Sequence, residues 1–364
     1  MAKFKVVLLK HGYPSIAHER RIVSAAGGEV IDTDPLSEDQ ALAACEDADA
    51  ILVRWNRITP ELIQRFGKCR IIIRYGVGYD NVDVAAATAA GIIVGHVPNY
   101  CLDEVSTHAI ALLLACVRNV IGKHEKLTRG AWEFNPIEKL HRTMGRTLGL
   151  VGLGNIGQAV VRKMSGWGMT LLANDPFVSA EVAQQLGVRL VGLDTLLGES
   201  DYVSLHVPLL PETVHLISQR ELDRFKPGAI LVNTARGPVL DNIALLGALN
   251  SGRIAQAALD VFEVEPPPAD SPLRCHPRIA LSDHVAWYSE ESQTELQITA
   301  AEEAVRVCSG GLPAAIANPE VLERVGRLAE WVPNYNARWQ LLRLKRMRSN
   351  PFGAPRAFEM DARS

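Results

Sequence analysis

Residues 150–157 read Leu-Val-Gly-Leu-Gly-Asn-Ile-Gly, and this string joins an apolar, strand-like run to a run with helical periodicity. In such a setting Gly152 permits a tight turn, Gly154 lets the backbone approach a pyrophosphate, and Gly157 allows close helix–strand packing. The helix that follows would point unpaired N–H groups and a positive dipole end at the phosphates. The string therefore predicts a dinucleotide-binding fold, which a bare glycine pattern without strand and helix would not.

An acidic residue follows at the position where such a fold needs one. A second apolar run ends at Asn174-Asp175-Pro176, and Asp175 lies 18 residues after Gly157. A carboxylate there accepts a hydrogen bond from a ribose 2′-hydroxyl and repels a 2′-phosphate. No Arg or Lys lies between Asn174 and Ala180 to neutralise that phosphate. The sequence therefore predicts NAD, rather than NADP, as the cofactor.

Length and composition narrow the class of protein. A chain of 364 residues is long enough for two domains, and 48% hydrophobic with 22% charged residues is typical of a globular protein. A formal net charge of −3 gives no reason to expect nucleic acid or an anionic membrane as a partner. The six cysteines are scattered without a CxxC pair, which favours a reducing compartment and disfavours a structural zinc.

The sequence also bears on localisation. The N-terminus runs straight into a strand-like segment without a visible secretory signal. The longest apolar stretch, residues 109–117, is too short to span a bilayer. We therefore expect a cytoplasmic protein with no membrane partner.

Strand-like and helical runs alternate in two sets, which indicates βαβ units around parallel sheets. The expected fold class is α/β, with two Rossmann-like or flavodoxin-like domains separated by a cleft and followed by a C-terminal extension. We expect one long helix over residues 103–121, an excursion over 122–146, and a helix over 289–308 that returns the chain to the first domain. The expected domains are 1–100 with 289–325, 101–288 for the dinucleotide, and 326–364 as the extension.

The extension differs in kind from the rest of the chain. It carries seven Arg or Lys residues against two acids after residue 330. Its apolar residues fall at helical spacing, and exposing them together would be costly. We expect the extension to dock on the body, reaching the neighbouring subunit of a dimer; a disordered basic end and attachment to an anion or nucleic acid are the alternatives. The apolar residues are Trp331, Tyr335, Trp339 and Leu342.

Three polar residues stand at or just beyond the ends of late strand-like runs. Arg236 follows the run at 229–233, Glu265 follows the run that contains Asp260, and His284 follows the run at 279–281. Ligands of open α/β sheets bind beyond the carboxyl ends of the strands. An arginine can grip a carboxylate with two parallel hydrogen bonds, and a histidine is suited to proton exchange near neutrality. Each residue alone has an ordinary structural interpretation; together they suit the reduction of a keto acid.

Five strings make the chain resemble the D-2-hydroxyacid dehydrogenase family over about residues 1–325. They are Arg-Tyr-Gly-Val-Gly-Tyr-Asp-Asn-Val-Asp (74–83), Gly-Leu-Gly-Asn-Ile-Gly (152–157), Asn-Thr-Ala-Arg-Gly (233–237), Ala-Leu-Asp-Val-Phe-Glu-Val-Glu-Pro (258–266) and His-Val-Ala-Trp-Tyr-Ser (284–289). The resemblance implies an NAD-dependent enzyme that interconverts a 2-keto acid and a D-2-hydroxy acid, working as a homodimer without a metal.

The resemblance also implies roles for individual residues. Arg236 would bind the substrate, and Glu265 would orient His284 and stabilise its imidazolium form. Asp260 would contact the nicotinamide carboxamide. The substrate would also meet Arg74, Val77, Gly78 and Trp287. The cofactor would be bound by Gly152, Gly154, Asn155, Ile156, Gly157, Asp175, Val207, Pro208, Thr213, Thr234, Ala235 and Asp260.

Within the family, Arg74 and Trp287 look most like the C-terminal-binding-protein branch, whose members also act as NAD-sensing corepressors. An NAD-gated scaffold is therefore the alternative to an enzyme. Ser282-Asp283 stands where the family usually has Thr-Pro, so a second carboxylate is expected near His284. Formate oxidation is disfavoured because formate enzymes carry glutamine in place of Glu265. D-3-phosphoglycerate stays open as a substrate.

Overall fold

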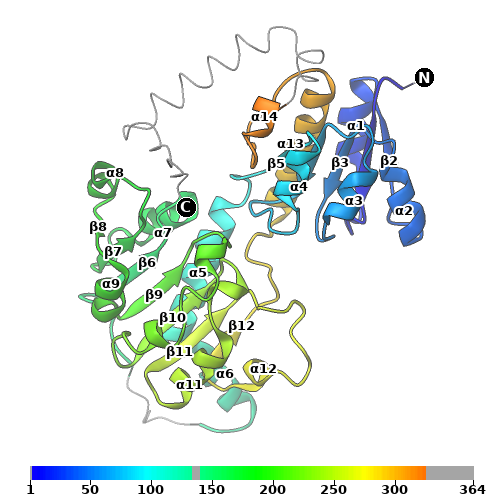
Figure 1. Cartoon of the computed structure of the whole chain (residues 1–364). Helices are drawn as coiled ribbons and strands as arrows, with labels where there is room; N and C mark the ends of the chain where they lie inside the picture. Colours follow the sequence, from blue (N-terminus) through cyan, green and yellow to red (C-terminus); the bar gives the residue numbers. More distant parts are fainter. Residues whose placement is uncertain (1, 133–139, 325–364) are drawn as a thin grey trace, which may run out of the picture. The chain divides into compact units, whose positions relative to one another are not determined.

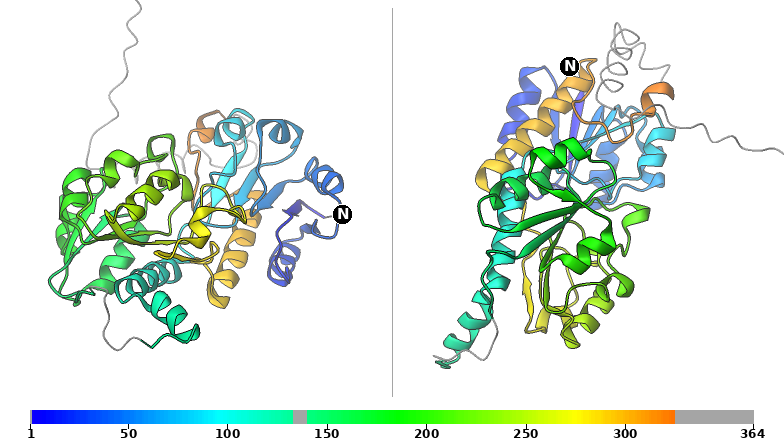
Figure 2. Two further views of the ribbon diagram at one scale, coloured as in Figure 1. Left: turned by 90° about the horizontal axis from the view of Figure 1, so that it is seen from below. Right: turned by 90° about the vertical axis from the view of Figure 1, so that its left-hand side faces the viewer.

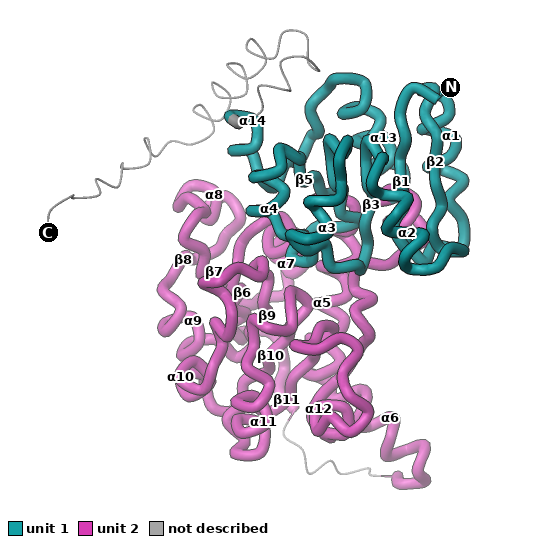
Figure 3. Tube along the Cα trace, turned by 45° about the vertical axis from the view of Figure 1, so that its right-hand side comes forward, with its two compact units in different colours: residues 1–97, 297–364 teal, residues 98–296 magenta. Residues whose placement is uncertain are grey.

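The structure is a computed structural model, and it describes residues 2–132 and 140–324. The described residues form two compact units, which Figure 3 colours separately: unit 1 holds residues 2–97 and 297–324, and unit 2 holds the described residues between 98 and 296. Each unit has its own sheet, with five strands in unit 1 and seven in unit 2, and all paired strands are parallel. These sheets confirm the predicted α/β fold class.

Unit 1 is a five-stranded sheet with the order β2-β1-β3-β4-β5. Its central strands are uninterrupted apolar runs because helices cover both faces of a parallel sheet; all four residues of β3 are buried. The strands are β1 (Lys5–Leu9), β2 (Glu29–Asp32), β3 (Ala50–Val53), β4 (Ile71–Arg74) and β5 (Ile93–His96). The helices are α1 (Ala17–Ala25), α2 (Glu38–Cys45), α3 (Pro60–Arg65), α4 (Val84–Ala89) and α14 (Val321–Arg324). Helix α13 (Glu290–Cys308) contains the boundary between the two units.

Unit 2 is a seven-stranded sheet with the order β12-β11-β10-β9-β6-β7-β8, so the strand order reverses direction at β6 and β9. The strands are β6 (Thr147–Val151), β7 (Thr170–Asn174), β8 (Arg189–Leu190), β9 (Tyr202–Leu205), β10 (Ala229–Asn233), β11 (Ile254–Leu259) and β12 (Ile279–Leu281). The α-helices are α5 (Leu102–Val117), α6 (Val120–Thr128), α7 (Asn155–Met164), α8 (Ala180–Gln185), α9 (Leu193–Glu199), α10 (Gln219–Leu222), α11 (Asn242–Asn250) and α12 (Pro272–Cys275). Two 3₁₀ turns, η1 (Pro211–Thr213) and η2 (Gly237–Val239), complete the unit.

Side chains that alternate along the strands of unit 2 enter two separate cores. Leu231 packs with α9 and α11 residues on one face, whereas its neighbours Ile230 and Val232 pack with α5 and α7 residues on the other. Figures 1 and 2 show helices on both faces of this sheet. Ligands of such doubly wound sheets bind where the strand order reverses, beyond the carboxyl ends of the strands. In unit 2 that point lies beyond β6 and β9.

The prediction of a single helix over residues 103–121 is wrong. The structure has two helices, α5 and α6, which are bent by 60° at their break. Asn119 lies at the break with a φ of 47°, and asparagine is one of the few residues that adopt this left-handed conformation readily. In the described part of the chain no single helix is long and apolar enough to cross a membrane; α5 and α6 taken together qualify by length and composition alone.

Other boundaries differ by a few residues. Helix α7 begins at Asn155, inside the glycine-rich string itself, which brings its first N–H groups into that loop. The chain passes between units at 97/98 and 296/297, where we expected 100/101 and 288/289. The predicted docking of the C-terminal extension, with Trp331, Tyr335, Trp339 and Leu342, concerns residues outside the described part of the structure.

Candidate active site

The glycine-rich loop joins β6 to α7, and each glycine has its own structural reason. Gly152 has a φ of +97°, and a Cβ there would lie 2.7 Å from the carbonyl oxygen of His206. A Cβ on Gly157 would lie 2.4 Å from the carbonyl oxygen of Gly152, so α7 packs directly against the turn. Gly154 caps α7, and a Cβ there would meet no atom within 4 Å. Open space at a helix N-terminus suits a phosphate group.

Asp175 is fixed beside this loop by three backbone N–H groups. Its Oδ2 atom accepts from Leu153 at 2.8 Å, and Oδ1 accepts from Phe177 at 2.8 Å and Val178 at 3.2 Å. Each carboxylate oxygen has two lone-pair sites, so Oδ2, which accepts only one N–H group, retains capacity for a ribose hydroxyl. The acid predicted from the sequence therefore lies at the glycine-rich loop in a defined orientation.

Two buried polar atoms beyond β9 and β10 have no hydrogen-bond partner among the described residues: Nε2 of His206 and Oγ1 of Thr234. Burial lowers the pKa of His206 to about 4, so this imidazole is neutral at physiological pH. Unsatisfied buried groups are uncommon in native proteins and call for a partner. A dinucleotide with hydroxyl, amide and phosphate groups fits such a site.

The remaining cofactor-binding candidates lie in the same loops. Val207 packs near Gly152, and Thr213 donates its hydroxyl proton to the carbonyl oxygen of Pro208 at 2.7 Å, which closes the 208–213 loop on itself. Ala235 donates its N–H to Oδ1 of Asn233 at 3.0 Å. Asn155 and Ile156 form the first turn of α7, where Asn155 is exposed and Ile156 is half-buried.

His284 and Glu265 form a close pair in unit 2. Nδ1 of His284 lies 2.6 Å from Oε2 of Glu265, and the N–H of Phe262 donates to Oε1 at 2.9 Å. Burial raises the pKa of Glu265, but the hydrogen bonds from His284 and Phe262 outweigh it and hold this pKa below its ordinary value. The positive charge of Arg236 acts in the same direction.

Asp260 is hydrogen-bonded to the backbone of the segment that carries His284. Its side chain is 1% exposed, and its carboxylate accepts the hydroxyl proton of Ser282 at 2.6 Å and the N–H groups of Val285 and Ala286 at 3.1 Å each. Asp283, the extra carboxylate expected near His284, is exposed. The structure thus places Arg236, Glu265, His284 and Asp260 in one region of unit 2, around the carboxyl ends of β10, β11 and β12.

The other substrate-binding candidates lie elsewhere in the chain. Arg74 ends β4 of unit 1, and Val77 and Gly78 follow in the next loop, where the carbonyl oxygen of Val77 lies 2.8 Å from Nδ1 of His96. Trp287 belongs to unit 2, with its ring 6.3 Å from that of Tyr100. Arg74, Val77 and Gly78 thus belong to unit 1, and Trp287 belongs to unit 2.

Sequence reasoning missed three residues beside Arg74. The guanidinium carbon of Arg54 lies 4.4 Å from the ring centre of Tyr13 and 5.0 Å from that of Trp55, and that of Arg74 lies 6.0 Å from Trp55. Tyr13 follows β1, whereas Arg54 and Trp55 follow β3. Applying the rule of carboxyl strand ends to the first domain as well as the second would have found them.

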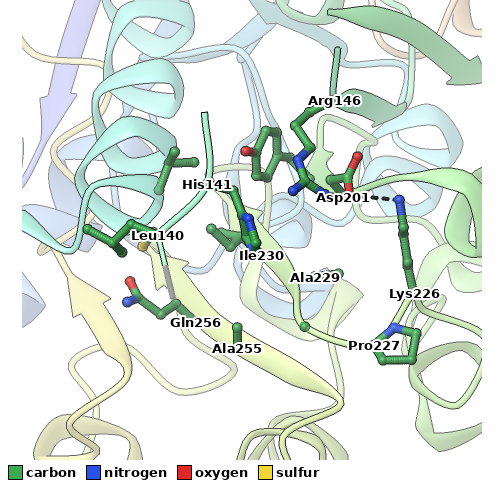
Figure 4. Close-up of a pocket in the computed structure, with 14 residues that line it drawn as sticks. Leu140, His141, Arg146, Asp201, Lys226, Pro227, Ala229, Ile230, Ala255 and Gln256 are labelled. Atoms are coloured by element: carbon green, nitrogen blue, oxygen red, sulfur yellow. Dashed lines mark hydrogen bonds and ion pairs between the residues drawn. The ribbon is translucent and has the colours of Figure 1, made fainter. Parts of the chain in front are cut away.

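The structure has two further features, a pocket in unit 2 and a cluster of possible metal ligands in unit 1. A pocket of about 190 Å³ lies at the opposite, amino-terminal ends of β6, β9 and β10, where Lys226 and Arg146 pair with Asp201 (Figure 4). His11, Asp32 and Asp34 are close enough to hold a metal, but Nδ1 of His11 already accepts the N–H of Tyr13 at 2.9 Å.

Residues 110–286 match the NAD-binding domain of D-isomer specific 2-hydroxyacid dehydrogenases. A glyoxylate reductase of Korarchaeum cryptofilum is 40% identical over 296 residues, which are 80% of this chain and 89% of that protein. The chain belongs to the D-2-hydroxyacid dehydrogenase family. It is an NAD-dependent oxidoreductase of that family, and NAD is its cofactor.

Other proteins similar to this chain are named for different substrates. A D-3-phosphoglycerate dehydrogenase of Methanocaldococcus jannaschii is 38% identical over 309 residues, which are 84% of this chain but 59% of that protein. The D-lactate dehydrogenase of Aquifex aeolicus, solved with NAD and lactic acid, is similar in structure, with a TM-score of 0.73 and 27% sequence identity. The match covers 83% of this chain and 93% of that one. The predicted family and cofactor are confirmed; the C-terminal-binding-protein-like branch stays a prediction.

Proposed function

We propose that this dehydrogenase reduces a 2-keto acid to a D-2-hydroxy acid with His284 as the acid and base of the reaction. The observation that carries the proposal is the 2.6 Å contact between Nδ1 of His284 and Oε2 of Glu265, in the unit that holds the glycine-rich loop. A carboxylate has no proton to give, so Nδ1 carries the proton of this hydrogen bond. Nε2 is then the ring atom that exchanges a proton with the substrate.

The remaining steps follow from the charges of the chain. NADH, when bound, supplies the hydride that reduces the carbonyl carbon. Arg236 holds the substrate carboxylate through two parallel hydrogen bonds and orients the carbonyl. His284 donates the proton at Nε2 to the carbonyl oxygen, and Glu265 stabilises the imidazolium form before the transfer. In the oxidation direction His284 accepts the same proton.

We further propose substrate-binding roles for individual residues of each unit. Backbone N–H groups of Val77 and Gly78 would bind the substrate carboxylate, and Arg74 would add a positive charge. Trp287 of unit 2 would face the substrate's side chain. In this proposal residues 1–100 with 289–325 are the substrate domain and residues 101–288 bind NAD.

A panel of 2-keto acids, assayed by NADH consumption with chiral analysis of the product, tests the proposal. We expect at least one keto acid to be reduced to the D product. His284→Ala should lower kcat by roughly two to four orders of magnitude, the usual range for general acid–base catalysis, with NADH affinity little changed. NADH binding without turnover of any keto acid would favour the NAD-sensing scaffold instead.

A further inference from the structure

The segment 282–289 carries His284 in a conformation that needs support. His284 has a φ of 57°, in the left-handed region that side chains other than glycine seldom adopt. Its N–H donates to the carbonyl oxygen of Asp260 at 2.8 Å, and the carboxylate of Asp260 accepts the next two N–H groups. Such a backbone persists only where its surroundings hold it.

Helix α5 holds the beginning of this segment through His108. Nε2 of His108 lies 2.9 Å from Oγ of Ser282 and 3.6 Å from Oδ1 of Asp260. Because Ser282 gives its only proton to the Asp260 carboxylate, its oxygen must accept from His108. His108 therefore presents an N–H at Nε2 whether its ring is neutral or charged.

The same helix holds the end of the segment through Glu104. Oγ of Ser289 donates to Oε1 of Glu104 at 2.7 Å. Glu104 and His108 are four residues apart, so they lie one turn from each other on the same face of α5. The two side chains therefore contact the segment on either side of His284.

We propose that Glu104 and His108 are positioning residues that clamp the segment 282–289 and so keep His284 within hydrogen-bond reach of Glu265. Other residues of α5, among them Ala109, Leu112 and Leu113, are buried in an apolar core, whereas Glu104 and His108 are half-buried. Partly buried polar side chains need hydrogen-bond partners. Here His108 contacts Ser282 at the start of the segment, and Glu104 contacts Ser289 at its end. The inference rests on the proposed role of His284.

Paired substitutions at the two positions test this inference. His108→Leu and Glu104→Leu each remove one contact, whereas His108→Gln keeps a donor near Nε2 and Glu104→Gln keeps an acceptor. We expect kcat to fall about tenfold in the two leucine variants, because small misplacement of a reacting group is costly, and to stay within threefold of wild type in the glutamine variants. KM for the keto acid and the Kd for NADH should change less than threefold throughout.

A control and a second pair of variants keep the test decisive. Thr107 lies next to His108 on α5 and is exposed, so Thr107→Val should leave kcat within twofold of wild type. If the leucine variants do not fold, Ser282→Ala against Ser282→Thr makes the same comparison, with the threonine retaining the hydroxyl. Leucine variants with kcat within twofold of wild type, or glutamine variants as impaired as leucine ones, would overturn the clamp. Failure of the proposed function differs, because wild-type enzyme would then reduce no keto acid.

Discussion

Nδ1 of His284 lies 2.6 Å from Oε2 of Glu265, although the two residues are 19 positions apart in the chain and follow different strands. The pKa of Glu265 is held below its ordinary value, so the carboxylate is ionised throughout the neutral range. Because this carboxyl pKa is depressed, the stabilisation from the His284–Glu265 hydrogen bond is fully present above the ordinary pKa of a glutamate. It is lost as the pH falls through that lowered pKa.

Glu265→Gln should move the pH dependence of reduction toward lower pH. The substitution removes the negative charge that stabilises the imidazolium form, so the rate should begin to fall at a lower pH than in wild type. The pH profile of kcat/KM measures the shift. An unchanged basic limb in the variant would mean that Glu265 does not act on His284.

Gly154→Ala and Gly152→Ala should separate cofactor binding from folding. Alanine at position 154 meets no protein atom and should cost about 1 kcal/mol of unfolding free energy, as helix caps do, but should raise the Kd for NADH at least tenfold. Alanine at position 152 would be strained by the φ of +97° and would collide with His206, so it should cost more than about 2 kcal/mol. Denaturant unfolding measures the loss of unfolding free energy, and NADH titration measures the Kd. Equal effects of the two variants on unfolding would contradict the different roles given to Gly152 and Gly154.

Asp175 should give at least a tenfold preference for NADH over NADPH, or about 1.4 kcal/mol. Asp175→Ala should narrow that preference because it removes the charge that repels a 2′-phosphate. The variant should also weaken NADH binding, since the carboxylate accepts three backbone N–H groups in the loop. The ratio of kcat/KM values for the two cofactors reports the outcome. Equal kcat/KM values with NADH and NADPH in the wild-type enzyme would contradict this prediction.

Arg54 and Arg74 both lie near Trp55, and we expect this pair of charges to favour keto acids with a second acidic group. Arg54→Met should lower kcat/KM for oxaloacetate relative to 2-ketobutyrate about tenfold, the value of one charged hydrogen bond. Arg57 is exposed in the same loop, so Arg57→Met is the matched control and should leave the ratio unchanged. A ratio that responds equally to both variants would count against a specific role for Arg54.

Helix α6 and the chain after it expose an apolar surface that suits a homodimer. Val120 is 56%, Leu127 55% and Trp132 79% exposed. Leu127→Glu should weaken self-association by at least tenfold, because it loses apolar burial and puts a charge in the interface. Ile243, also apolar and exposed in unit 2, provides the control: Ile243→Glu should leave the dimer intact. Sedimentation analysis of the wild type and both variants measures their self-association. A wild-type monomer at micromolar concentration would exclude the dimer.

Local patterns were sufficient for much of the fold. Alternating apolar and helical runs predicted both parallel sheets because burial on two faces demands uninterrupted apolar strands, and this signal is local. The glycine-rich loop and Asp175 were also readable, since each glycine answers a steric need within a few residues. The break at Asn119 was missed because apolar residues continue on both sides of it, and a single left-handed residue leaves no periodic signal.

The sequence by itself determined the two α/β domains, the dehydrogenase family and NAD as the cofactor. Only the tertiary structure decided which distant residues meet: Glu104 and His108 reach the segment around His284 across 185 and 174 residues. It likewise brought Tyr13 and Arg54 together beside Trp55. The physical reason is that helical periodicity shows which face of α5 is buried, whereas strand order and helix packing decide what that face touches.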